Sequence, residues 1–235
     1  MSDDSNTYRL RVVQRAPTGD PLDLEQPLDG LVRALSRLDP SLFELSGLSP
    51  AMQTTPVLQG EQSLVPAFLS TSEIAWNFGR EPADPTHEIV FFNAEHGSRT
   101  VVLRLSFVAN GAASAAPGLV AELTLGHDAA GPSDNSRGAH LDELFSMLLE
   151  ALHPDHGHVK LPGHPDGNQP GVYEVGWITY FSQSERPLPA DLCPPAVKMP
   201  TEEGTKIFAT PALALERNAD LAAAIDRVRE QLGSA

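Results

Sequence analysis

The chain has 235 residues and an ordinary globular composition, with 41% hydrophobic and 20% charged residues. Its unusual property is charge, because 31 acidic and 16 basic residues give a formal net charge of −15 at neutral pH. Proteins that follow a phosphate backbone or dock on an anionic membrane need basic patches, so this charge argues against direct binding of either. Acidic residues outnumber basic ones in each of the stretches 1–60, 61–130, 131–200 and 201–235, which predicts an acidic folded surface and not an acidic tail.

The cysteine content and the N-terminus favour a cytoplasmic protein. The single cysteine, Cys193, cannot form an internal disulfide. Residues 1–6 lack the basic and apolar regions of a signal peptide, and no window is apolar enough for a transmembrane helix. We therefore expect a soluble cytoplasmic chain, in which Cys193 is a small apolar filler of a proline-flanked loop.

The first half of the chain is predicted to be rich in strands. A strand over 8–15 is followed by a leucine-striped helix over 24–38, which ends at Asp39-Pro40 because a residue before proline avoids the α region. Residues 41–65 show no sustained period and are interpreted as an irregular or short-helical connection. Strands are predicted over 73–78, 88–93, 100–108 and 119–125, and their alternation of apolar and polar residues is typical of an antiparallel sheet with one covered face.

The second half adds two helices to this pattern. A turn-rich segment over 126–138 leads to a helix over 141–152, which ends at His153-Pro154, and a polar loop follows. A strand over 172–181 with a bulge at Gly176, a proline-heavy loop or extended segment over 186–200, a strand over 206–210 and a helix over 218–232 complete the chain. The order predicts a single α+β domain over 1–235, a mostly antiparallel sheet with helices packed on one face, preceded by flexible residues 1–7.

The segment from His153 to Asp166 is the densest group of metal-ligand residue types. It contains four of the eight histidines, His153, His156, His158 and His164, together with Asp155 and Asp166. A metal-dependent hydrolase built on this segment is therefore an alternative function. Proline and glycine interrupt the segment, however, and no pair has the i, i+4 spacing of an HExxH helix, although His156 and His158 could share one side of a strand. An exposed loop is the ordinary interpretation, and we expect neither a metal nor a cofactor.

Catalytic motifs are missing from the sequence. It contains no GxSxG, P-loop, GxGxxG or CxxC pattern, so we expect no catalytic residues and no enzyme. The two tryptophans, Trp76 and Trp177, lie in predicted strands. Core packing is the ordinary role of such residues, and an exposed anchor at a protein interface is the alternative.

Several short motifs in order along the chain carry a family resemblance. They are Leu38-Asp39-Pro40 at the end of the first helix, Leu152-His153-Pro154-Asp155-His156-Gly157, Gly176-Trp177-Ile178-Thr179-Tyr180-Phe181, and Gly204-Thr205-Lys206-Ile207-Phe208-Ala209-Thr210 before the last helix. Over residues 8–232 this order resembles the immunity protein 52 family of bacterial polymorphic-toxin systems. The family often has tryptophan after Pro-Asp, where this chain has His156.

The resemblance implies a function in binding. Such proteins are encoded beside toxins, often nucleases, and protect the producing cell by binding the cognate toxin, without catalysis. A nuclease holds a polyanion, so its cleft is expected to be basic and an acidic protein could occupy it. The candidate toxin-binding residues are Asp142, Glu143, Asp155, Trp177, Glu202 and Glu203. For each carboxylate the ordinary alternative is a solvated surface charge, and a non-catalytic adaptor of a secretion system is a further alternative for the whole protein.

Overall fold

The computed structural model describes residues 7–15, 24–48, 53–71, 86–94, 99–108, 118–130, 134–163, 174–185, 188–189, 191–211 and 218–233. The helices of these residues are α1 (Glu25–Leu38), α2 (Val65–Thr71), α3 (Asp134–Leu152) and α4 (Asn218–Gly233). The strands are β1 (Thr7–Arg15), β2 (Leu45–Leu48), β3 (Thr54–Pro56), β4 (Leu58–Gln59), β5 (Gln62–Ser63), β6 (Thr86–Asn93), β7 (Val101–Val108), β8 (Gly118–Gly126), β9 (His156–Lys160), β10 (Ile178–Ser182), β11 (Val197–Pro200) and β12 (Gly204–Phe208).

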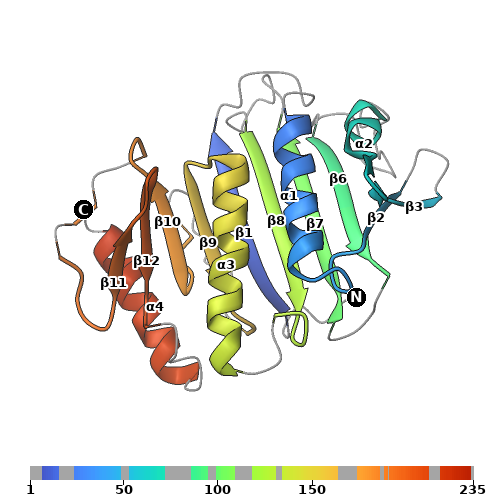
Figure 1. Ribbon diagram of the computed structural model, residues 1–235. Coiled ribbons are helices and arrows are strands. Elements are labelled where there is room, and N and C mark those ends of the chain that lie inside the picture. Colours follow the sequence, from blue (N-terminus) through green and yellow to red (C-terminus); the bar gives the residue numbers. More distant parts are fainter. Residues whose placement is uncertain are drawn as a thin grey trace.

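Most of the strands belong to one large sheet (Figure 1). Its ten strands follow the order β11-β12-β10-β9-β1-β8-β7-β6-β2-β3, while β4 and β5 form a separate pair. Every neighbouring pair runs antiparallel. The predicted α+β class with a mostly antiparallel sheet is therefore confirmed.

The central strands present one continuous apolar face. Leu10 of β1 lies opposite Leu123 of β8, and Leu123 lies opposite Leu103 of β7, with all three fully buried. Cross-strand partners share a face, so the alternation seen in the sequence produces a single apolar layer. α1 and α3 cover this layer with their own buried stripes, Leu28, Leu31, Val32 and Leu35 from α1 and Leu141, Leu144, Phe145, Leu148 and Leu152 from α3.

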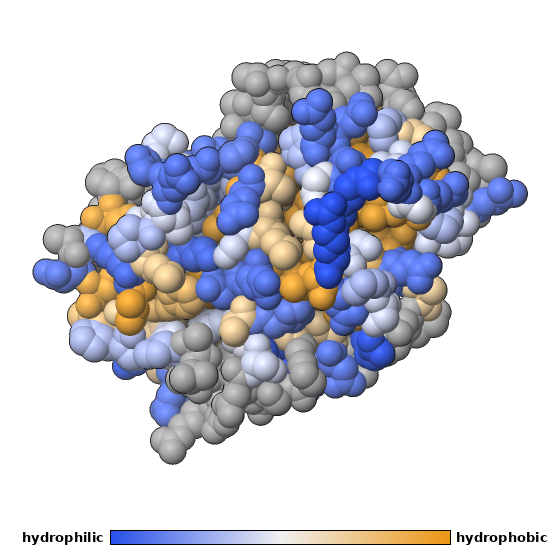
Figure 2. Space-filling view, in the orientation of Figure 1, coloured by the Kyte–Doolittle hydropathy of each residue, from blue (hydrophilic) through white to orange (hydrophobic). Residues whose placement is uncertain are grey.

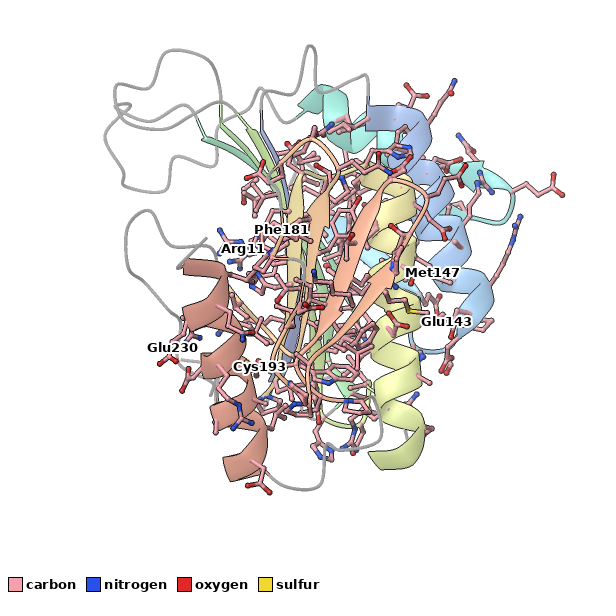
Figure 3. All side chains as sticks on the ribbon, turned by 90° about the vertical axis from the view of Figure 1, so that its left-hand side faces the viewer. Arg11, Glu143, Met147, Phe181, Cys193 and Glu230 are labelled. Atoms are coloured by element: carbon pink, nitrogen blue, oxygen red, sulfur yellow. The ribbon has the colours of Figure 1, made fainter. Side chains whose placement is uncertain are left out.

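α4 lies on the opposite face of the sheet (Figure 3). Its buried residues are Leu221, Ala224, Ile225, Val228 and Leu232. The expectation that all helices share one face is thus correct for α1 and α3 and wrong for α4. The reason is that the β10–β12 end is apolar on both faces. Lys206 of β12 points toward α3, and successive side chains of a strand point to opposite faces, so Ile207 points away from α3. Ile207 is nevertheless fully buried.

β9 corrects part of the interpretation of the segment from His153 to Asp166 as an exposed polar loop. The strand His156–Lys160 pairs with β1 on one side and β10 on the other, and all five of its residues are buried. Gly157 permits this position, since a Cβ there would lie 3.0 Å from Phe145 Cζ of α3. A segment with a composition typical of loops therefore forms a central strand, because β1 and β10 pair with it on both sides.

Other boundaries differ from the prediction as well. α3 begins at Asp134, within the segment predicted to be turns, and residues 41–65 contain β2 to β5 instead of an irregular connection. β1 includes Thr7, and β10 begins only at Ile178. β12 ends two residues before the predicted end at Thr210. The proline-heavy segment 186–200 contains β11, which agrees with the extended alternative predicted for it. The predicted strand over 73–78, with Trp76, lies outside the described residues.

Candidate functional site

The first of the candidate acidic residues, Asp142, is held in an ion pair between α3 and β12. Lys206 Nζ lies 2.6 Å from Asp142 Oδ1 and 2.6 Å from Ser146 Oγ, one turn further along the helix. The side chain of Lys206 is 8% exposed, whereas that of Asp142 is 30% exposed. This pair fixes the side of α3 that faces β12, and it shows that Asp142 already has an internal partner.

Two further carboxylates continue along α3. Glu143 follows Asp142, and Glu150 lies seven residues later, which places both on the same side of the helix. Both side chains are exposed. Sequence reasoning missed Glu150, although its helical spacing from Glu143 could have identified it.

The C-terminal end of α3 meets the turn between β11 and β12. His153 has a left-handed backbone conformation with a φ of 43°, and its amide donates to Leu149 O at the end of the helix. Its Nδ1 lies 2.8 Å from Glu203 Oε2, so the exposed carboxylate accepts a hydrogen bond from the ring. Glu202 is exposed beside it. The helix dipole adds partial negative charge at this end of α3.

The pKa of Tyr180 reflects the negative potential of the same region. Burial, together with the charges of Glu203 and Asp155, raises the pKa of its phenol above the ordinary value. Asp155 joins the strands here, because its amide donates to Val13 O and its carbonyl accepts from Ser182. Gly204 leaves room for the phenol, since a Cβ there would lie 2.7 Å from the Tyr180 hydroxyl oxygen and 2.2 Å from Phe181 O.

The structure thus brings together five of the six candidate residues, from three separate parts of the sequence. We call the set formed by Asp142, Glu143, Glu150, Asp155, Glu202 and Glu203 the α3–β12 surface. Lys206 offsets one of these carboxylates, because it is buried under Asp142 and pairs with it. Figure 2 shows hydrophilic side chains on this face over α3, with hydrophobic ones reaching the surface toward β11 and β12. The arrangement can attract and orient a basic partner.

Trp177 is not part of this surface. Its side chain is fully buried, with an edge-to-face contact to Phe208 at a centroid distance of 6.1 Å. The interpretation of Trp177 as an exposed anchor is therefore corrected, and the residue packs in the core.

Cys193, expected as a filler, is instead exposed, and its amide donates to Gln231 Oε1 of α4.

The histidines of β9 form a polar cluster on the other face of the sheet. His158 Nε2 lies 3.3 Å from Glu174 Oε2, and the same carboxylate lies 3.2 Å from Arg11 Nη1 and 3.8 Å from Lys160 Nζ. Burial, followed by the nearby charges of His156, Lys160 and Arg11, lowers the pKa of His158 well below its ordinary value. Two cations, Arg11 and Lys160, around one carboxylate make this cluster unsuited to a divalent cation.

The described residues contain no group of three or more histidine, cysteine, aspartate or glutamate side chains placed to hold a metal ion. His164 and Asp166, which the hydrolase alternative requires, lie outside the described residues. Within the same part of the chain, none of the helices has the length and apolar character needed to cross a membrane.

Comparison with known proteins adds no relative. No protein-family model matches the chain, and no curated protein matches its sequence. The α3–β12 surface is therefore interpreted from its own geometry and charge.

Proposed function

We propose that this chain is an immunity protein that binds and neutralises a cognate bacterial toxin in the cytoplasm, by forming a stoichiometric complex and without catalysis. The observation that carries the proposal is the gathering of carboxylates on the α3–β12 surface, which comes from α3, the start of β9 and the β11–β12 turn. The motif order along the chain, which resembles that of the immunity protein 52 family, favours the same function.

The charge of this surface indicates the kind of toxin. A nuclease must hold a polyanion, so its substrate cleft carries basic residues that an acidic protein surface can occupy. Opposite charges also accelerate association, to about 10⁸ M⁻¹s⁻¹ or more at low salt. Rapid capture is useful when an incoming toxin has to be stopped before it cuts nucleic acid. We therefore propose a nuclease with a basic cleft as the partner.

Co-expression tests the proposed function directly. The toxin domain encoded beside this chain should arrest growth when expressed alone, and this chain should restore growth and co-purify with it. Neither rescue nor co-purification would contradict the proposal. A stable homo-oligomer that ignores the toxin would favour the adaptor of a secretion system instead.

Charge variants test whether the α3–β12 surface is responsible. The triple variant Glu143→Gln/Glu202→Gln/Glu203→Gln should associate roughly tenfold more slowly at low salt and show a weaker salt dependence. The matched control is Glu25→Gln/Glu44→Gln/Glu61→Gln, which removes the same charge from exposed residues elsewhere on the chain. Equal effects of the two variants would indicate net charge alone and would exclude a specific role for this surface.

A further inference from the structure

Two large apolar side chains of the described residues are exposed, and both belong to β11. Val197 is 49% exposed and Met199 is 52% exposed. They are two residues apart in a strand, so they point to the same face of the sheet. β11 lies at the edge of the sheet, with β12 on its inner side (Figure 1).

The pairing of β11 with β12 identifies that face. Met199 lies opposite Lys206, and Val197 lies opposite Phe208. Because Lys206 reaches Asp142 and Ser146 of α3, its side chain and that of Met199 are on the side of the sheet that α3 covers. The exposed apolar pair is therefore next to the α3–β12 surface and shares its face.

The backbone edge of β11 is poorly suited to pairing with a further strand. Thr201 N donates to Gly204 O, so in the alternating antiparallel pattern the backbone groups of Lys198 and Pro200 face outward. Pro200 has no N–H, and the strand is only four residues long. A partner is thus expected to contact the side chains on the face and not to extend the sheet.

We propose that Val197 and Met199 form the apolar centre of the surface through which this chain binds a basic protein, with the carboxylates of the α3–β12 surface as its rim. An apolar centre surrounded by charge is the usual construction of a specific interface, in which the centre supplies most of the affinity. A second copy of this chain would bring the same carboxylates and would be repelled. The partner is therefore a basic protein that presents an apolar side chain among lysines and arginines.

This inference rests on the proposed function, and the experiment separates the two. The double variant Val197→Thr/Met199→Gln makes both exposed side chains polar without changing charge. The probe is the neighbouring toxin domain in a catalytically inactivated form, and the readout is Kd with its rate constants. We expect binding to weaken by about 30-fold or more, mainly through faster dissociation.

The control is Val90→Thr, the same chemical change on the face of β6 opposite to the buried Ile89 and Phe91. It should bind as the unmodified chain does. If the double variant also binds within about threefold of the unmodified chain, the inference is wrong while the proposed function stands. If the unmodified chain does not bind the toxin domain, both are wrong. A dimer of the unmodified chain that becomes a monomer in the double variant would assign the surface to a second copy and would also overturn the inference.

Discussion

The ion pair between Asp142 and Lys206 allows a quantitative test of how α3 is attached to the outer strands. The perturbation is Asp142→Asn, which keeps the size of the side chain and an accepting oxygen but removes the charge. In the unmodified chain the Lys206 side chain is 8% exposed and its ammonium lies 2.6 Å from Ser146 Oγ, so the variant would leave a buried cation without its carboxylate. A buried cation that loses its counter-charge raises the free energy of the folded state.

The expected magnitude follows from the burial of the two partners. Breaking a fully buried pair costs about 3–5 kcal/mol, whereas an exposed pair contributes about 0–1 kcal/mol. Here one partner is buried and the other is 30% exposed. We therefore expect Asp142→Asn to lower the free energy of unfolding by about 2 kcal/mol and Tm by about 4–8 °C. Lys206→Met removes the buried charge itself and should change stability by less than about 1 kcal/mol.

A double-mutant cycle measured by urea denaturation completes the assay. Asp142→Asn in the Lys206→Met background should cost almost nothing, which gives a coupling energy of about 2 kcal/mol. The control is Glu143→Gln, which removes the neighbouring exposed carboxylate and should change stability by less than about 0.5 kcal/mol. An Asp142→Asn variant no less stable than Glu143→Gln, or a cycle without coupling, would show that the ion pair does not stabilise the attachment of α3.

Three further outcomes are expected. Gly176→Ala should lower the free energy of unfolding by about 3 kcal/mol, because a Cβ there would lie 2.2 Å from Val159 O. Gly30→Ala in α1, where a Cβ would meet no atom within 4 Å, should raise the free energy of unfolding by about 0.5–1 kcal/mol, and thermal denaturation compares the two variants. Glu203→Gln should lower the raised pKa of Tyr180, because it removes a nearby negative charge. A phenolate absorbance titration, with Tyr180→Phe to assign the signal, measures this pKa, and an unchanged value would exclude the electrostatic contribution of Glu203. Because the pKa of His158 is lowered in the folded chain, the unfolded chain binds a proton at His158 below about pH 6.5 whereas the folded chain does not, and the free energy of unfolding should decrease as the pH falls through that value. Urea denaturation over a pH series measures this dependence, and a His158→Asn variant with an equally steep dependence would contradict it.

The elements with strong apolar periodicity could be predicted from the sequence. The stripe Leu28, Leu31, Val32 and Leu35 indicated α1, and the alternation of Val101, Leu103 and Leu105 indicated β7, because each pattern matches one buried face. Such residues identify an element whenever its other face is exposed. The α+β class followed from the order of these elements along the chain.

β9 could not be predicted in the same way, since its burial comes from strands distant in the sequence. His156, His158 and Lys160 have the polarity of a loop, but β1 and β10 enclose them and Glu174 supplies a counter-charge from outside the strand. The candidate site was predicted in part for a related reason. Exposed carboxylates such as Glu202 and Glu203 are visible in the sequence, whereas their proximity to α3 depends on a sheet order that local patterns do not contain.

The two faces of the sheet help to explain how an acidic protein can present a specific acidic surface. On the face opposite α3, Arg11 and Lys160 both contact the carboxylate of Glu174, so their positive charges lie away from the α3–β12 surface. On the α3 side, Lys206 is buried beneath Asp142 and offsets one carboxylate, which leaves Glu143, Glu150, Glu202 and Glu203 exposed to solvent. Carboxylates that are far apart in the sequence therefore lie exposed on the same side of the sheet as Val197 and Met199. A basic partner would gain both attraction and apolar contact on this side, which is why we propose the α3 side as the binding face.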